Sequence, residues 1–176
     1  HVNIGSEGAN HWSNTREEGG RFLGEGVHFL DLCNWFAGQY PQSLTASFMG
    51  DADELNPNVS TTVAYDNGTI CHVLYTTEGS SQMSKEYFEM HGNGVSVRCD
   101  NFNSLTIKGA GRLVSKMKKG LKGQLEELVE FSDAVQGQST EENPADARAG
   151  WVATWMVRAA IQSAREQKSV LFLPQV

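Results

Sequence analysis

The chain has 176 residues, 39% of them hydrophobic and 20% charged, which is enough to build a core and argues against intrinsic disorder. Its net charge of −7 at pH 7 argues against nucleic acid or an anionic membrane as a partner, because phosphate groups bind to basic faces. No apolar run has the length of a membrane span and no signal-peptide pattern opens the sequence, so we expect no membrane contact.

The three cysteines, Cys33, Cys71 and Cys99, are far apart in the sequence and form no Cys-x-x-Cys pair. Zinc sites and disulfide frameworks require closer, paired spacing. We therefore predict free buried thiols, no metal site, and the reducing environment of a cytoplasmic location.

The first residues, His1-Val2-Asn3-Ile4-Gly5, are typical of a strand already under way, and there is no initiator Met. We expect a boundary inside a longer gene product. Residues 6–20 are rich in Gly, Ser, Asn, Glu and Thr and predict a long polar loop, of a kind that usually carries function.

A helix is predicted next, over about residues 26–37. Phe29, Leu32, Cys33 and Phe36 fall on one helical stripe, and Gly38 is a typical C-terminal stop.

The middle of the chain alternates apolar and polar residues over short runs, which is typical of an antiparallel sheet with one solvent-exposed face. Asn67-Gly68 between two such runs predicts a hairpin in which both turn residues have positive φ. The expected strands are residues 44–49, 59–65, 69–77, 85–91, 95–99, 105–107 and 113–117.

The end of the chain is predicted to be helical. Residues 121–135 carry one apolar stripe, and Asn143-Pro144 predicts the N-cap and first position of a helix that runs to Arg165. Trp151 and Trp155 follow the helical spacing and are expected in the core.

A last strand over residues 170–173 completes the expected elements. Together they predict an α+β domain spanning residues 1–176, with an open, mostly antiparallel sheet and helices packed on one face.

The sequence has none of the common nucleotide or metal motifs. The Gly-x-Gly pairs that begin at Gly24, Gly92 and Gly109 each lack a third glycine and a strand-to-helix setting. We therefore expect no cofactor-binding residues in this chain.

The most informative segment is residues 18–32, where glycines lead directly into the predicted helix. Glu25, His28 and Asp31 are spaced three apart, so they lie close together on its first turns. An imidazole beside a carboxylate is a plausible general acid and base for a hydroxyl group. The alternative is a partly buried helix histidine with two ordinary acids, and the spacing by itself does not decide between them.

The run Gly-Gly-Arg-Phe-Leu-Gly-Glu-Gly-Val-His-Phe-Leu-Asp-Leu (residues 19–32), followed by Trp-Phe-Ala-Gly at residues 35–38, resembles the opening of the C-terminal domain in the glucose–fructose oxidoreductase / inositol dehydrogenase family, Gfo/Idh/MocA. The hairpin around Asp66-Asn67-Gly68-Thr69 and the helix after residue 122 are also similar. The resemblance covers nearly the whole chain.

This resemblance implies a substrate-binding and oligomerisation domain that works with an N-terminal Rossmann domain. That Rossmann domain is absent from this chain and is expected to make most of the contacts with NAD or NADP. His28 matches the family's proton-transfer residue, and the open sheet face implies a homo-oligomer. Many members carry an Asp four residues before that His, where this sequence has Gly24 with Glu25 beside it. The role of the acid is therefore open.

Six further residues are candidate site residues. Arg21 and Glu25 are expected to position the substrate, although Arg21 has acidic neighbours with which it can pair instead. His11 and Trp12 suit stacking on a sugar ring, or equally serve to hold the loop down. Asn3 is expected to reach the pocket from the first strand. Asp31 is expected to orient residues within the helix.

Two classes of function follow. The first is the substrate-binding domain of an NAD(P)-dependent oxidoreductase that acts on a sugar or polyol hydroxyl and is inactive without its Rossmann domain. The second is a non-catalytic dimerisation or ligand-binding module that uses the sheet face. A stand-alone sugar-binding domain is a third, weaker candidate.

Overall fold

A computed structural model gives the structure of the chain and describes residues 1–6, 12–109, 113–116, 123–138 and 146–172. The chain divides into two compact units. The larger combines Val2–Met83 with Ala145–Val176, and the smaller combines His1 with Ser84–Pro144. Each unit is described by itself.

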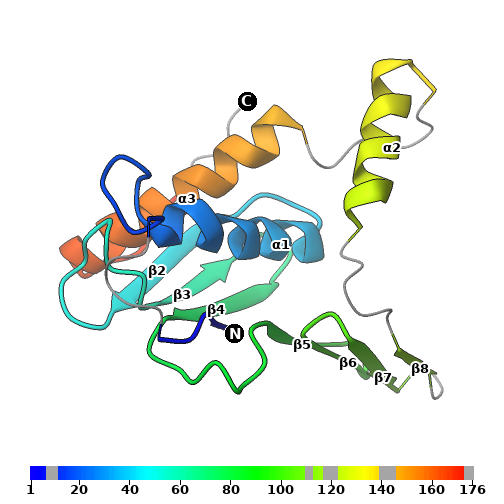
Figure 1. Cartoon of the computed structure of the whole chain (residues 1–176), viewed down its shortest axis with the longest axis horizontal. Coiled ribbons are helices and arrows are strands. Elements are labelled where there is room, and N and C mark those ends of the chain that lie inside the picture. Colours follow the sequence, from blue (N-terminus) through cyan, green and yellow to red (C-terminus); the bar gives the residue numbers. More distant parts are fainter. Residues whose placement is uncertain (7–11, 110–112, 117–122, 139–145, 173–176) are drawn as a thin grey trace. The chain divides into compact units, whose positions relative to one another are not determined.

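The larger unit is built on a five-stranded sheet in the order β1-β4-β3-β2-β9 (Figure 1). Its centre is an antiparallel meander, and the short β1 pairs with β4 in parallel. The strands are β1 (Val2–Asn3), β2 (Ser43–Phe48), β3 (Val59–Ala64), β4 (Ile70–Thr76) and β9 (Val170–Leu171).

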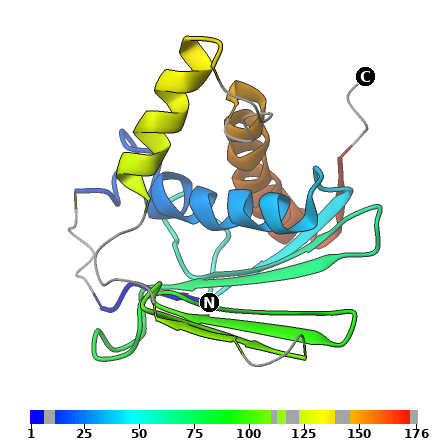
Figure 2. The same cartoon turned by 90° about the vertical axis from the view of Figure 1, so that its right-hand side faces the viewer.

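Three helical segments lie on one face of this sheet (Figures 1 and 2). A π-helical turn, η1 (Phe22–Gly26), continues into α1 (Val27–Ala37), and α3 (Ala147–Glu166) packs against both α1 and β2. The alternation of β3 accounts for the core, since Val59 and Val63 are buried while Ser60 is exposed. Leu30 of α1 and Met156 of α3 complete a core with fully buried side chains.

The smaller unit contains a four-stranded antiparallel meander in the order β5-β6-β7-β8. Its strands are β5 (Tyr87–Gly92), β6 (Val95–Asp100), β7 (Ser104–Lys108) and β8 (Leu113–Lys116). The unit also contains the amphipathic helix α2 (Gln124–Val135), whose apolar side chains, including Leu125 and Phe131, are exposed.

These elements confirm the predicted α+β class, with antiparallel pairing in every strand pair of the described residues except β1 with β4. Apart from the starts of α2 and α3, the predicted strand and helix limits agree to within about two residues where the chain is described. Leu121 and Leu173, which were expected to begin one helix and end the last strand, lie outside the described residues.

The hairpin at Asn67-Gly68 forms, but its turn type differs from the prediction. Only Gly68 has positive φ, at 83°, and its N–H donates to the Tyr65 carbonyl while Tyr65 N–H donates to Thr69. The loop is therefore a three-residue turn that ends in a left-handed glycine. Asn67 uses its side chain to bind the Ala37 carbonyl and the Thr69 N–H, which favours ordinary negative φ there.

The expected start of the last helix was wrong. α3 begins at Ala147, and its N-cap is Asp146, whose carboxylate accepts a 2.7 Å hydrogen bond from Ala149 N–H. An aspartate with extended backbone dihedrals satisfies the first-turn donors as well as Asn143 would have done. Trp151 was also wrongly expected in the core, because 48% of its surface is exposed.

Candidate active site

The glycine-rich loop before the first helix makes close backbone contacts. Gly20 has φ of 83°, and its N–H donates to the Thr15 carbonyl. A Cβ at this position would lie 2.0 Å from the Glu54 carbonyl oxygen, so only glycine fits. The loop residues 12–20 are thereby held against the segment after β2, and the chain leaves Gly20 directly into η1.

The π-helical turn places Glu25 beside Arg21 and over Tyr75 of β4. Arg21 Nε lies 3.4 Å from Glu25 Oε2, as an ion pair rather than a well-aligned hydrogen bond. Their side chains are 12% and 25% exposed, so both are largely removed from water. π-helical turns within helices occur often at functional sites.

Tyr75 of β4 is the third member of this cluster. Its hydroxyl donates a 2.7 Å hydrogen bond to Glu25 Oε2, and its side chain is fully buried against Phe22 and Phe29. Burial, followed by the hydrogen bond to Glu25, raises the pKa of Tyr75 well above its usual value, so the hydroxyl stays protonated as a donor. In this cluster the Glu25 carboxylate is held by the Tyr75 hydroxyl and the Arg21 guanidinium.

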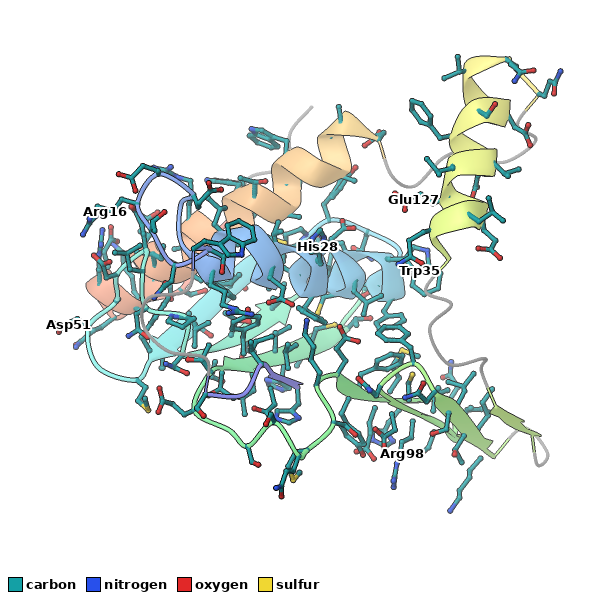
Figure 3. All side chains as sticks on the ribbon, viewed as in Figure 1. Arg16, His28, Trp35, Asp51, Arg98 and Glu127 are labelled. Carbon is teal, nitrogen blue, oxygen red and sulfur yellow. The ribbon has the colours of Figure 1, made fainter. Side chains whose placement is uncertain are left out.

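His28 stands on the next turn with its side chain exposed (Figure 3). Asp31, one turn further along α1, is half-buried, and burial raises the pKa of its carboxyl while the charge of His28 partly opposes the shift. The imidazole and the carboxylate therefore act on one another electrostatically. Two cavities described in this chain lie elsewhere and do not include His28.

The remaining predicted site residues are placed differently. Asn3 is buried, with its amide donating to the Ser80 carbonyl and accepting from Gly5 N–H, so both ends of the side chain are engaged. Trp12 is 70% exposed in the loop. His11 lies outside the described residues. Arg21, Glu25, His28 and Asp31 thus lie on the continuous segment formed by the start of η1 and the first turns of α1.

Sequence reasoning missed Tyr75. The alternation of β4 predicts that Tyr75 and Val73 point to the same face, but it cannot identify a partner fifty residues away. The available signal was a tyrosine at a core position, since a buried hydroxyl requires a hydrogen-bond partner.

Within the described ranges, no group of three or more His, Cys, Asp or Glu side chains has the arrangement of a metal site. None of the helices in that part of the chain combines the length and apolar character needed to cross a bilayer.

Comparison with known proteins gives the same fold. The crystal structure of aldose–aldose oxidoreductase from Caulobacter crescentus, complexed with glycerol, is 16% identical with a TM-score of 0.72, covering 97% of this chain and 54% of its own. An NAD-binding oxidoreductase from Klebsiella pneumoniae is 15% identical with a TM-score of 0.74, over 99% of this chain and 58% of its own.

An oxidoreductase from Agrobacterium radiobacter, in complex with NAD⁺, L-tartaric acid and magnesium, is 17% identical with a TM-score of 0.70, over 97% of this chain and 55% of its own. The chain thus spans a little more than half the length of these three structures. No match to a curated protein sequence was found.

The family model of the GFO/IDH/MocA C-terminal domain matches residues 2–98, which is more than half of the sequence. The match includes the glycine-rich loop, η1, α1 and the meander β2 to β4. This chain therefore belongs to the Gfo/Idh/MocA family, in the part of it that forms the C-terminal domain.

Proposed function

We propose that this chain supplies the substrate-binding residues of an NAD(P)-dependent oxidoreductase that acts on a sugar or polyol hydroxyl, with His28 as the proton-transfer residue. The observation that carries the proposal is the exposed imidazole of His28, one turn from the carboxylate of Asp31 and next to the Arg21–Glu25–Tyr75 cluster. An accessible base beside a half-buried acid suits removal of a proton from an alcohol.

Arg21 and Glu25 are proposed to position the substrate. Glu25 is fixed by the Tyr75 hydroxyl, and Arg21 lies beside it as a cationic partner. A carboxylate that is already held in place can accept a hydrogen bond from a sugar hydroxyl without reorganising. Trp12, exposed on the loop before this turn, offers an apolar ring face to the same kind of ligand.

The sequence and the described residues lack the usual dinucleotide-binding turn. In the described ranges the parallel strand pair is β1 with β4, and no glycine-rich turn joins a strand to a helix with the Gly-x-Gly-x-x-Gly pattern. We therefore place NAD or NADP mainly on a separate Rossmann domain of the same protein and assign no step at the cofactor to this chain. We also propose that this chain is inactive when it is alone and that the protein is cytoplasmic.

The test is turnover of a sugar and polyol panel by the protein that includes the Rossmann domain. His28→Ala is expected to lower kcat by about 10²- to 10⁴-fold, the contribution typical of a general acid and base. The matched control is His91→Ala, because His91 is also exposed but lies on β5, hydrogen-bonded to Ser96. Full activity of the His28 variant would show that the imidazole moves no proton.

A second function is favoured by one surface. The face of the five-stranded sheet away from α1 and α3 exposes Ile70, Leu74 and Leu171, by 61%, 48% and 67%. The register aligns Ile70 and Leu171 on one row across the sheet, through Ala64 and Ser43. We propose that this face forms the contact of a homo-oligomer.

The oligomer is tested by light scattering after size-exclusion chromatography. Ile70→Glu is expected to shift the protein toward monomer, because it buries a charge in an apolar contact. Leu125→Glu, an equal change on the exposed stripe of α2, is the control and should leave the mass unchanged. A mass that is monomeric before any substitution contradicts this role of the sheet.

A further inference from the structure

A cavity of about 260 Å³ opens where α1 ends and α3 begins. It is lined by the segment after α1, by Asp66 of the β3–β4 turn, by the first turns of α3 and by Phe172. Ten residues of helix and loop lie between His28 and Gln39, so the cavity lies on the order of 15 Å along α1 from the proposed active site. Nothing in the proposed reaction uses it.

The wall of this cavity is aromatic. Trp151 and Trp155 stack with ring centroids 5.6 Å apart at 23°, and Trp155 meets Phe172 edge-on at 4.5 Å. Trp155 and Phe172 are packed into the core and fix the arrangement, whereas Trp151 keeps 48% of its surface exposed. A rigid indole beside a cavity is an apolar platform whose surface is still available to a ligand.

The rim of the cavity is polar and carries both signs of charge. The Arg148 guanidinium lies 4.8 Å from the centroid of the Tyr40 ring, and both residues line the cavity. Asp66 supplies a carboxylate acceptor, and the side chains of Gln39 and Gln42 supply amide groups. The cavity therefore offers acceptors and donors around one apolar wall.

We propose that this cavity is a second ligand site, which binds one neutral, hydroxylated ring such as a pyranose or a cyclitol. A ring of this kind has an apolar C–H face to lie on Trp151 and equatorial hydroxyls that donate to Asp66 and accept from Arg148. An anion is disfavoured by Asp66, and a purely aromatic ligand leaves the polar rim without partners.

The size of the cavity agrees with this choice. Pockets for drug-sized ligands run from roughly 300 to 1,000 Å³, so a volume of about 260 Å³ suits a single ring. The inference does not rest on the proposed reaction, because it uses none of the residues around His28.

The test is a titration of this chain with D-glucose and with myo-inositol, followed by the indole N–H signals of Trp151 and Trp155 in ¹H–¹⁵N spectra. Both tryptophans line the cavity, so the Trp155 signal is the readout in the Trp151 variants. Trp151→Phe identifies the Trp151 signal and retains an aromatic platform, so it should keep binding. Trp151→Ala is expected to weaken binding by roughly tenfold, the equivalent of about 1.4 kcal/mol. Asp66→Asn should weaken binding while leaving the melting temperature unchanged.

Two controls separate this site from other surfaces. Trp35→Ala removes a tryptophan that is 62% exposed on α1 and does not line the cavity, and His28→Ala removes the proposed catalytic residue. Both should bind the two ligands as wild type does. The proposal is overturned if neither ligand shifts the Trp151 signal, if Trp151→Ala binds with wild-type affinity, or if His28→Ala abolishes the shift.

Discussion

Tyr75 on β4 donates its hydroxyl to Glu25 Oε2 at 2.7 Å, which ties the middle of the sheet to the turn that precedes α1. This bond explains how a carboxylate that is only 25% exposed is held in position beside Arg21. The site segment is therefore attached to the core through a side chain and not only through the backbone.

Removing this hydroxyl is expected to destabilise the larger unit. Tyr75→Phe keeps the buried ring and loses one hydrogen bond to a charged group, for about 1–3 kcal/mol. The melting temperature should fall by several degrees. Tyr87→Phe removes a hydroxyl that donates to Glu89 on the exposed surface and should leave the melting temperature unchanged. Equal decreases in melting temperature for the two variants would show that the Tyr75 hydrogen bond stabilises the fold no more than a surface hydrogen bond does.

Gly20 and Gly50 form a matched pair for the role of the glycine-rich loop. Both have φ near +83°, but a Cβ at Gly20 would lie 2.0 Å from the Glu54 carbonyl oxygen, whereas a Cβ at Gly50 has open space. Gly50→Ala should cost about 1–2 kcal/mol for its backbone conformation. Gly20→Ala should cost roughly 1–3 kcal/mol more, because the chain must also relieve a clash.

Chemical denaturation in urea measures this difference. If the two alanine variants unfold at the same urea concentration, the contact of Gly20 with Glu54 does not constrain the loop.

Asp31 is expected to make stability depend on pH. Burial raises the pKa of its carboxyl above the ordinary value of 3.8, so the folded chain binds the proton more tightly than the unfolded chain does. By linkage, stability falls as the pH rises through the interval between the unfolded and the folded pKa. Asp31→Asn removes this penalty and should raise the free energy of unfolding at pH 7.

The advantage of Asp31→Asn should disappear below about pH 4, where the wild-type carboxyl is protonated in both states. Asp51→Asn removes the same charge from an exposed position and serves as the control for net charge. Urea unfolding at pH 7 and pH 3 gives the comparison. A stability gain of the same size at both pH values would mean that the carboxyl charge is not its cause.

The N-cap of α3 gives a prediction about the helix that carries Trp151. Asp146→Ala removes the acceptor of the Ala149 N–H and should cost about 1 kcal/mol. Asp146→Asn keeps an oxygen acceptor in the same place and should unfold near the wild-type temperature. Thermal unfolding followed by circular dichroism is the measurement, and a stable alanine variant would show that another group caps the helix.

Local patterns were enough to predict much of the fold. The stripe through Phe29 and Cys33, the left-handed stop at Gly38 and the alternation of the strands all depend on residues within a few positions of one another. Residues 18–32 were predicted to be the site segment from their resemblance to the family, because the spacing of Glu25, His28 and Asp31 by itself did not decide. Patterns over so few residues reveal a helical or a strand period. The period predicts whether an element is a helix or a strand and which of its faces is buried.

Only the tertiary structure decided which groups meet. Tyr75 reaches Glu25 across fifty residues, and Asn3 is engaged by Ser80, which lies 77 positions away. Trp151 has the spacing of a core residue and yet is exposed. The first turns of α3 extend past the sheet and α1, so neither covers that end of the helix (Figure 1). Periodicity states which side of a helix is apolar, but the length of the neighbouring elements determines how much of that side is buried.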